Sequence, residues 1–466
     1  MRSCTRDSRW NSDYAAGGRT RILGQAPMQA ASRKKDMQRI MKPILAAILI
    51  STAACAPAPG VLTGIDVLES EGFQELRGKR IGLVTDHTGV DNKGRSTAAI
   101  LASAPDVSLV AIFSPDYGIA GDGQSVGVSS SSTARIAGFD IPVYSLSSGG
   151  IAGMRPKHGN LAGLHALVFD MQDIGSRFYT SLAIMGMALE ESARADIGFY
   201  VLDRPNPING VSIEGPTLDD LSLRRISPRA FYAVPVRHGM TAGEVALLYN
   251  AEVRNSELHV IAMKGWSRSM WFDQTSLPWV PPSPDMPSLD AATLYPGIAL
   301  FEASNAAVGL GTPAPYRWIG APWMNAQAVL KNMEGKPLAG LQISAQDYAP
   351  TEGVYAGLLC HGLRLKITDR EKLSPLAVFL QIMLALRHVH PNEFVWRWDE
   401  AKLMTGNDNF RHLYERDARL DKFQELFEKD ARDFEEARKP FLLYPEPDAA
   451  LLPDNRNDPP PGEHAP

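Results

Sequence analysis

Residues 166–203 read ALVFDMQDIGSRFYTSLAIMGMALEESARADIGFYVLD, and the fold class follows from their pattern. Two apolar runs, residues 166–172 and 197–203, have the length of buried strands. Residues 181–195 lie between them and have the composition of an amphipathic helix. A strand, a helix and a second strand in this order are typical of a βαβ unit, whose two strands are parallel.

The same alternation continues on both sides of this unit. Further strand-like runs are residues 79–85, 107–113, 141–146 and 258–266, and further helix-like segments are residues 96–104 and 241–253. Apolar runs that alternate with helices predict a parallel sheet covered by helices. We therefore expect an α/β protein with a Rossmann-like, doubly wound domain over residues 63–285.

The composition changes at residues 278–287, PWVPPSPDMP, where five of ten residues are proline. Such a segment is extended and stiff, so we expect a domain boundary there. Beyond it, a strand-like run at residues 363–369 and helix-like segments at 376–389 and 423–441 predict a smaller C-terminal α/β domain over residues 288–445. Residues 446–466 are polar and rich in proline, and we expect them to be disordered.

Residues 1–55 have the features of a leader. After a polar, arginine-rich stretch, Met37 begins a short basic segment, and residues 43–54 form an apolar run too short to cross a membrane. Small residues before Cys55 resemble a bacterial lipoprotein cleavage site, with Cys55 as the lipidated residue. The alternative is an ordinary secretory signal cut near Ala54. Both readings predict that the protein is exported. The lipoprotein reading further predicts a periplasmic or outer-membrane lipoprotein.

Composition excludes several other functions. The chain has 466 residues and a formal net charge of −5, which gives no electrostatic reason to expect a nucleic-acid partner. Its three cysteines are Cys4, Cys55 and Cys360, and no Cys-x-x-Cys pair exists for a thiolate zinc site. The histidines lack metal-ligand spacing, and we expect neither a metal nor a cofactor.

Acidic residues gather where the predicted strands end. These positions are Asp86 with His87, Asp116, Asp170 with Asp173, and Asp203. In an open parallel sheet, ligands bind outside the carboxyl ends of the strands. A single acid at such a position is more often a cap or turn residue, but four exits at one edge predict a functional site.

Basic, aromatic and amide side chains follow these acids. Arg177 and Tyr179 precede one predicted helix, Arg204 and Asn206 lie in DRPNP, and His238 lies near the start of another helix. An arginine can bind a carboxylate or phosphate through two parallel hydrogen bonds, although Arg177 could instead pair with Asp170 or Asp173. His238 is either a general base or a helix-start residue satisfied by the backbone.

Three tryptophans, Trp266, Trp271 and Trp279, suit either stacking on sugar rings or interdomain packing.

Residues 123–127, GQSVG, match the Gly-x-Ser-x-Gly motif around Ser125. A glycine-rich loop precedes them and a poor helix follows, so a nucleophile elbow is not expected. The overlapping GDGQSVG lacks the glycine spacing and the helix of a dinucleotide-binding loop.

The chain resembles the DUF1343 family, which includes the NamZ-type exo-β-N-acetylmuramidases. The motifs that carry the resemblance are IGLVTDHTGV, FSPDYGIAG, FDMQDIGSRFYT, VLDRPNPINGVSIEGP, PVRHGMTAGE, WVPPSPDMP, LYPGIALFEASN and GLGTPAPYRWIGAPW, in the family's order over residues 63–445. The resemblance implies a Rossmann-like domain, a smaller C-terminal domain and an active-site cleft between them. It also implies release of terminal N-acetylmuramic acid from peptidoglycan fragments.

Some motif positions differ from the family's usual residues. Pro-Glu-His-Gly is Pro115-Asp116-Tyr117-Gly118 here, and its glutamate is the family's favoured catalytic acid. Glu-Gly-Arg-Gly-Thr is Val308-Gly309-Leu310-Gly311-Thr312, and aspartates replace the usual asparagines at positions 86 and 285. Asp116 is one methylene shorter than glutamate, which retracts the proton donor by about 1.5 Å. Misplacement on this scale can slow a reaction about a hundredfold.

Glycoside cleavage needs a proton donor and a second group at the anomeric carbon, for which we expect Asp116 and Asp173. The expected substrate-binding residues are Asp86, His87, Tyr117, Asp170, Arg177, Tyr179, Asp203, Arg204, Asn206, His238 and Asn305. The leading hypothesis is an exported exo-glycosidase that acts on muropeptides. A catalytically impaired muropeptide-binding lipoprotein is the alternative, and an esterase that uses Ser125 is a distant third.

Overall fold

The computed structural model describes residues 21–23, 60–115, 118–121, 131–146, 150–255, 257–336 and 338–445. Cys55, Asp116, Tyr117, Ser125 and the tail 446–466 lie outside the described residues. Among the residues that the structure describes, no helix is long and apolar enough to span a bilayer.

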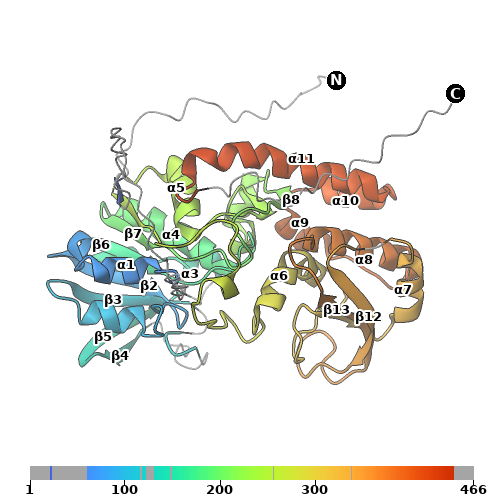
Figure 1. Cartoon of the computed structure of the whole chain (residues 1–466), viewed down its shortest axis with the longest axis horizontal. Helices are drawn as coiled ribbons and strands as arrows, with labels where there is room; N and C mark the ends of the chain where they lie inside the picture. Colours follow the sequence, from blue (N-terminus) through green and yellow to red (C-terminus); the bar gives the residue numbers. More distant parts are fainter. Residues whose placement is uncertain are drawn as a thin grey trace, which may run out of the picture.

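The first domain is built on a twisted, mainly parallel sheet (Figure 1). Its strands, in spatial order, are β1 (Arg21–Leu23), β10 (Leu258–Ile261), β7 (Gly198–Leu202), β6 (Ala166–Asp170), β2 (Arg80–Thr85), β3 (Ser108–Ser114), β5 (Phe139–Ser145) and β4 (Ser131–Ile136). Only the pair of β4 and β5 is antiparallel. This order confirms the expected doubly wound α/β fold.

Helices cover both faces of the sheet because side chains alternate along each buried strand. The helices of this domain are α1 (Gly64–Ser70), α2 (Thr97–Ala102), α3 (Gly150–Gly153), α4 (Thr180–Arg194) and α5 (Ala242–Val253). Ile81 and Leu83 pack with α1 and α2 on one face, whereas Val84 packs with α4 and α5 on the other. Helix α5 begins at a capping box between Thr241 and Glu244.

One strand was not expected from the sequence. Residues 21–23, within the segment expected to be a leader, form β1 and pair in parallel with β10. On the opposite edge of the sheet, the β4–β5 hairpin adds a strand that the sequence pattern did not predict either.

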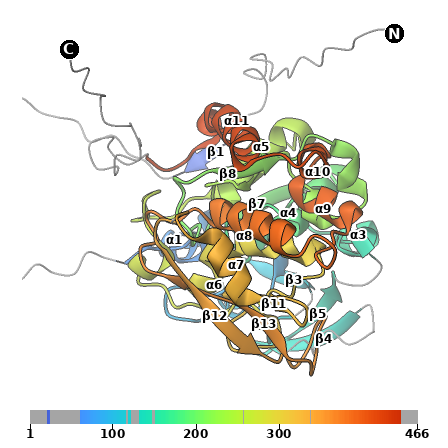
Figure 2. The ribbon, with the colours of Figure 1, turned by 90° about the vertical axis from the view of Figure 1, so that its right-hand side faces the viewer.

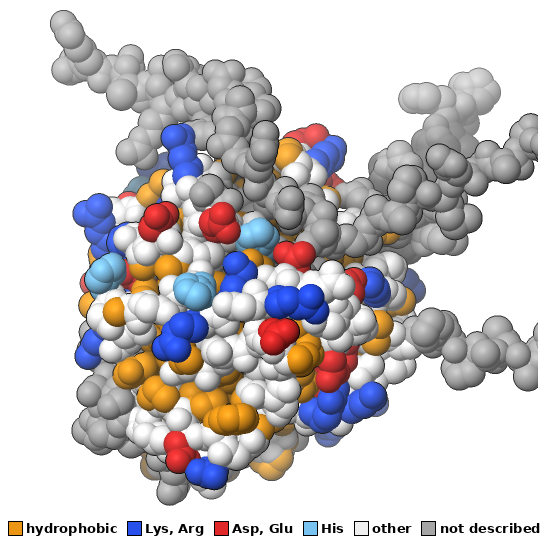
Figure 3. Space-filling view, turned by 90° about the vertical axis from the view of Figure 1, so that its left-hand side faces the viewer, with side chains coloured by type: hydrophobic (Ala, Val, Ile, Leu, Met, Phe, Trp, Pro, Cys, Tyr) orange, Lys and Arg blue, Asp and Glu red, His pale blue; other side chains and the backbone are white. Residues whose placement is uncertain are grey.

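On the visible part of the left-hand face of Figure 1, acidic and basic side chains are interspersed (Figure 3). That face therefore offers no single-sign surface for a polyanion.

The second domain contains a smaller, antiparallel sheet. Its strands lie in the order β11 (Trp318–Ala321), β13 (Cys360–Ile367) and β12 (Leu341–Tyr348), and its helices are α6 (Leu289–Ile298), α7 (Ala326–Met333), α8 (Pro375–Val389), α9 (Trp398–Thr405), α10 (Asn409–Glu415) and α11 (Leu420–Arg438). Helices α6, α7 and α8 lie over one face of this sheet (Figure 2). Ile319, Leu363 and Leu365 point into the core beneath them.

The end of the chain returns to the first domain. Helix α11 runs over both domains (Figure 1) and packs on the short strand β8 (Glu214–Thr217), which pairs with β9 (Pro235–Arg237). Buried Arg438 donates hydrogen bonds to the carbonyl oxygens of Gly210, at 3.0 Å, and Gly239, at 2.6 Å. These charge-assisted bonds fasten the end of α11 to the first domain.

Candidate active site

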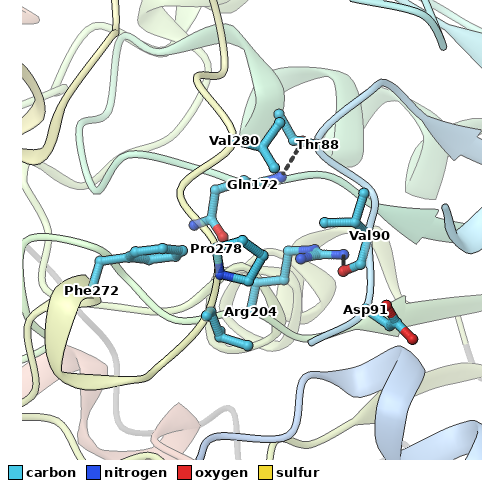
Figure 4. A pocket seen from close by; sticks show the side chains of 9 residues that line it. Thr88, Val90, Asp91, Gln172, Arg204, Phe272, Pro278 and Val280 are labelled. Carbon is cyan, nitrogen blue, oxygen red and sulfur yellow. Dashed lines mark hydrogen bonds between the residues drawn. The ribbon is translucent and has the colours of Figure 1, made fainter. Parts of the chain in front are cut away.

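The strand order reverses between β2 and β6, so the loops after these strands leave in opposite directions. This reversal is the topological switch point, where ligands bind in open α/β sheets. Asp86 follows β2, and Asp173 lies three residues after the end of β6. The backbone N–H of Gln172 donates a 2.9 Å hydrogen bond to Oγ1 of Thr88, which ties the two loops together (Figure 4). The sequence prediction that these two acids share one edge is confirmed.

Asp173 is held in one orientation by two hydrogen bonds. The backbone N–H of Gly175 donates to Oδ2 at 2.7 Å, and Oγ of Ser181 donates to Oδ1 at 2.9 Å. Gly175 has a φ of 79°, and a Cβ there would lie 2.4 Å from Oδ1 of Asn206, so only glycine fits. The side chain of Asp173 is buried but not fully enclosed.

His238, the residue directly after β9, faces Asp173. Its Nε2 lies 3.7 Å from Oδ2 of Asp173, and its Nδ1 accepts a 3.2 Å hydrogen bond from the backbone N–H of Met240. Because Nδ1 is an acceptor, the neutral ring carries its proton on Nε2, which is directed at the acid. From the sequence, we expected His238 among the substrate-binding residues. It is only 1% exposed, however, so it can act on a substrate only through Asp173.

Tyr179 lies beside these acids at the start of α4. Burial raises the pKa of its hydroxyl well above the usual value, and the charges of Asp86 and Asp173 raise it further. Its ring meets that of Tyr295 edge-on, with centroids 5.9 Å apart. Tyr179 therefore remains a neutral hydrogen-bond donor next to the carboxylates.

Asp86 is oriented by its own loop. Its Oδ1 accepts hydrogen bonds from the backbone N–H of Thr88 at 2.8 Å and from the hydroxyl of the same residue at 2.5 Å. Burial raises the pKa of Asp86, and the hydrogen bonds from Thr88 partly oppose this rise. Nε2 of the neighbouring His87 is 2.8 Å from the carbonyl oxygen of Pro281, and a Cβ on Gly121 would lie 2.8 Å from the His87 ring.

The second domain supplies acids and tyrosines that sequence reasoning missed. Oε1 of Glu302 accepts a 2.9 Å hydrogen bond from the hydroxyl of Tyr316, and Oε2 accepts a 3.0 Å bond from Arg229. Burial raises the pKa of Tyr295, and the charges of Glu302 and Asp173 both add to this effect. The ring of Tyr295 packs against Tyr179 of the first domain and, with centroids 4.7 Å apart, against Tyr316 of the second.

Asp285 belongs to the same group. Burial raises the pKa of its carboxyl, and the charges of Glu352 and Glu302 raise it further. Together these side chains form what we term the acid–tyrosine cluster: Asp86, Asp173, Tyr179, Asp285, Tyr295, Glu302 and Tyr316. Glu302 lies on a 3-10 helix, so the strand-end pattern did not single it out, although it stands within the family motif LYPGIALFEASN.

The proline-rich segment 278–287 crosses the switch point. Pro278 and Val280 line a cavity of about 10 Å³ together with Thr88, Gln172 and Arg204 (Figure 4). This volume is enough for about one water molecule and is far below the 300–1,000 Å³ of typical ligand pockets. The cavity therefore belongs to the packing of the segment against the sheet.

Four residues that we expected to bind substrate are instead bonded within the protein. Asp170 accepts hydrogen bonds from Arg204, whose Nε lies 2.5 Å from Oδ1 and whose terminal nitrogen lies 3.0 Å from Oδ2. The same terminal nitrogen of Arg204 donates to the carbonyl oxygen of Val90 at 2.6 Å. The hydroxyl of Thr97 also donates to Asp170. Asn206 bonds the backbone of Met240 and Ile208. These partners correct the expected role of Asp170, Arg204 and Asn206 to a structural one.

Asp203, the fourth, is completely buried. It accepts hydrogen bonds from the backbone N–H groups of Arg204 and Gly243 and from the hydroxyls of Thr241 and Tyr444, at 2.6–3.0 Å. Burial raises its pKa to about 6, against the lowering effect of these bonds. With four donors and no exposed surface, Asp203 fixes the start of α5 to the sheet.

Arg177 and Asn305 also have structural contacts. Arg177 donates a 2.6 Å hydrogen bond to the carbonyl oxygen of Met404 in α9, and burial lowers its pKa to about 9. It pairs with neither Asp170 nor Asp173 and is 1% exposed, so the expected carboxylate fork for a substrate is wrong. The amide of Asn305 bonds the backbone of Glu393 and Val395.

The three tryptophans pack within the protein. Trp266 and Trp271 are buried, the first against Tyr444 with ring centroids 4.9 Å apart. Trp279 meets Phe272 edge-on at 5.1 Å. These contacts favour packing over sugar stacking. Within the described ranges, no group of three or more His, Cys, Asp and Glu side chains is arranged to hold a metal ion.

Comparison with known proteins identifies the family. The models of the N-terminal and C-terminal domains of the exo-β-N-acetylmuramidase NamZ match residues 81–290 and 293–444. The chain is 36% identical over 391 residues to the peptidoglycan β-N-acetylmuramidase NamZ of Bacillus subtilis, covering 84% of this chain and 92% of that protein.

Two solved structures of DUF1343 family proteins from Bacteroides fragilis share the fold. Their TM-scores are 0.75 and 0.65 at 33% and 27% sequence identity, and each comparison covers 84% of this chain and all of the other. The resemblance seen in the sequence is confirmed, and the protein belongs to the NamZ family of exo-β-N-acetylmuramidases.

Proposed function

We propose that this protein is an exported, exo-acting glycosidase that releases terminal N-acetylmuramic acid from peptidoglycan fragments. The observation that carries the proposal is its 36% identity to the Bacillus subtilis muramidase over 92% of that protein's length. The acid–tyrosine cluster supports it, because Asp86 and Asp173 lie at the switch point of the sheet. Tyrosines in edge-on contact lead from there to Glu302 of the second domain: Tyr179 contacts Tyr295, Tyr295 contacts Tyr316, and Tyr316 donates to Glu302. Glycoside cleavage by a carboxylate pair requires such a concentration of acids.

In the proposed reaction, Asp116 donates a proton to the leaving oxygen. Asp173 is the second catalytic carboxylate and either attacks the anomeric carbon or activates a water molecule. Hydrogen bonds from Ser181 and Gly175 fix the orientation of Asp173, and Nε2 of His238 lies 3.7 Å from its Oδ2. Tyr179 supplies a neutral hydroxyl for hydrogen bonds to the sugar, and Asp86 and His87 border the same space.

A second candidate function is binding of muropeptides without cleavage. It is favoured by Val308 and Leu310, which stand where the resembling family has glutamate and arginine. Val308 is 3% exposed and belongs to the apolar core of the second domain, and its carbonyl oxygen accepts a hydrogen bond from the backbone N–H of Tyr316. A charged pair beside the acid–tyrosine cluster is thus replaced by apolar side chains.

One experiment separates the two functions. The purified protein is incubated with a chromogenic N-acetylmuramic acid glycoside and with muropeptides, and released sugar and binding heat are both measured. Release of N-acetylmuramic acid from the non-reducing end supports the glycosidase. Binding without release over a long incubation supports the binding protein, and neither signal would contradict both.

For localisation, we propose a lipid anchor on Cys55. Each buried CH₂ group of a lipid chain contributes about 0.8 kcal/mol to membrane binding, so loss of the chains is easily detected. Cys55→Ser should move the protein from the membrane fraction to the soluble exported fraction. Unchanged membrane association in this variant would refute the anchor.

A further inference from the structure

We infer that the second domain carries a separate site for the carboxylate groups of a peptide. The site is a cavity of about 200 Å³ between the start of α6, the loop before β11 and the strand β13. The side chains that define it are Arg317, Trp318, Arg364, Lys366 and Asp290. None of them belongs to the acid–tyrosine cluster.

The charge of this cavity is positive and largely uncompensated. Three cations line it against one acid, and Arg317 lies 3.8 Å from Oδ2 of Asp290. Nε of Arg317 has no hydrogen-bond partner within the described ranges, and a second nitrogen has only a 3.4 Å contact with the Pro313 carbonyl oxygen. Because Nε is buried, the terminal nitrogens of Arg317 are the atoms that can bind a stronger acceptor.

Arg364 and Lys366 are exposed cations on β13. Neither has a carboxylate within ion-pair distance among the residues that the structure describes. On α11, by contrast, Lys422 pairs with Glu425 at 2.7 Å and Lys429 with Asp433 at 2.9 Å. The two cations of β13 therefore contribute a local positive charge that the protein itself does not neutralise.

Strand geometry defines the ligand. Arg364 and Lys366 are two residues apart on β13, so their side chains leave the same face about 7 Å from each other. An extended peptide repeats its side-chain direction over the same distance, which matches two carboxylates along one peptide chain. Trp318 lies opposite Arg364 in the sheet register and is half-buried, which adds an apolar wall to the cavity.

The size and place of the cavity suit a peptide attached to a sugar. A volume of 200 Å³ holds one or two side chains but is smaller than the usual pocket for a whole ligand. The loop before β11 borders both sites, because the hydroxyl of Tyr316 reaches Glu302 while the adjacent Arg317 lines the cavity. Resting on the proposed function, the ligand is the acidic peptide of a muropeptide.

The test uses the full-length protein and measures binding directly, so that it does not depend on turnover. The double variant Arg364→Ser/Lys366→Ser is compared with Lys422→Ser/Lys429→Ser, which removes the same charge from α11. Both are titrated with a muropeptide that carries an acidic peptide and with the same glycan without the peptide. All four side chains are exposed, so the thermal midpoints should stay close to that of the wild type.

We expect the β13 variant to bind the peptide-bearing fragment about fivefold to tenfold more weakly at low salt, with unchanged affinity for the bare glycan. The α11 variant should match the wild type with both ligands, and Lys366→Glu alone should weaken only the acidic fragment. Equal affinities of the β13 variant and the wild type for the peptide-bearing fragment would overturn the inference. So would tighter binding of glycerol phosphate than of the acidic peptide, since it would assign the site to phosphate.

Failure of this inference is distinguishable from failure of the proposed function. A protein that releases N-acetylmuramic acid but binds both fragments equally, in wild-type and variant form, contradicts only the peptide site. A protein that shows peptide-dependent affinity without any release supports the peptide site and contradicts the glycosidase.

Discussion

Oδ2 of Asp173 lies 3.7 Å from Nε2 of His238, and both side chains are buried at the carboxyl edge of the central sheet. The backbone N–H of Met240 donates to Nδ1, so the neutral ring directs its proton at the acid. We expect His238 to act as a positioning residue for Asp173, the proposed catalytic carboxylate. This relationship also changes the role of His238, which we had expected among the substrate-binding residues.

Asp173→Asn should reduce kcat at least a hundredfold, because the amide can neither attack the anomeric carbon nor accept a proton from water. The thermal midpoint should change little, since the amide oxygen can still accept one of the two hydrogen bonds. Steady-state kinetics with a chromogenic substrate measures the loss. Asp106→Asn, at an exposed acid far from the sheet edge, is the control and should be fully active. Wild-type activity in Asp173→Asn would move the second carboxylate elsewhere.

His238→Phe should lower kcat about tenfold and leave KM nearly unchanged, because the ring orients Asp173 and does not contact the sugar. His238→Gln should recover part of the loss, since its amide can donate a hydrogen bond in the same direction. A merely structural role predicts instead that both variants lose thermal stability and activity in proportion. A lowered kcat with unchanged KM, together with partial recovery in His238→Gln, would distinguish a positioning role from a merely structural one.

The ion pair between Arg229 and Glu302 joins the two domains and is partly buried, at 3.0 Å. In a double-mutant cycle on the free energy of unfolding, Arg229→Met and Glu302→Gln should couple by about 1 kcal/mol. The exposed pair of Arg411 and Glu415 on α10 is the matched comparison, with an expected coupling of about 0.3–0.5 kcal/mol. Strictly additive effects at the interdomain pair would show that it does not hold the domains together.

Asp203 should make folding stability depend on pH. Burial raises the pKa of its carboxyl from 3.8 to about 6, so the folded state binds the proton more tightly than the unfolded chain does. Its contribution to stability is complete below pH 3.8 and is lost as the pH rises through about 6. The difference corresponds to about 3 kcal/mol.

Chemical denaturation between pH 4 and 7 tests this. The free energy of unfolding of the wild type should fall relative to that of Asp203→Asn as the pH rises, by up to about 3 kcal/mol. The exposed Asp106→Asn should follow the wild type. Parallel curves for wild type and Asp203→Asn would contradict the raised pKa.

Asp116 lies outside the described residues, and its role stays a prediction from the family resemblance. Asp116→Asn should remove most of the activity, because the amide cannot donate the proton that the leaving oxygen needs. Asp116→Glu should leave activity equal or higher by restoring the longer reach. Full activity in Asp116→Asn would assign the proton donor to another acid of the cluster.

Much of the fold could be predicted because its signals are local. The predicted helix at residues 181–195 corresponds to α4, and the apolar runs around it correspond to β6 and β7. The strand β12 was not predicted, because its exposed positions are polar and its inner face is only partly buried. The edge strand β4, rich in serine, likewise has no apolar run to mark it.

The candidate site was predicted only in part, because spacing along the chain does not show which groups satisfy each acid. Asp170 is neutralised by Arg204, 34 residues later, and Asp203 receives a hydrogen bond from Tyr444, 241 residues later. Both acids occupy the strand ends that indicated a site, yet their hydrogen-bonding capacity is used by the protein itself. Glu302 was missed for the opposite reason, since its partner Arg229 becomes a neighbour only when the first domain meets the second.

The hydrogen bond between Tyr444 and Asp203 also determines when the contacts of the first domain can be completed during synthesis. At roughly 5–20 residues per second, the ribosome delivers Tyr444 about 10–50 s after Asp203. During that interval Asp203 lacks one of its four hydrogen-bond donors. Arg438 also has not yet bonded the carbonyl groups of Gly210 and Gly239. The first domain therefore cannot complete these contacts before Tyr444 has been synthesised, and under the proposed export a chain that still lacks them is easier to translocate unfolded.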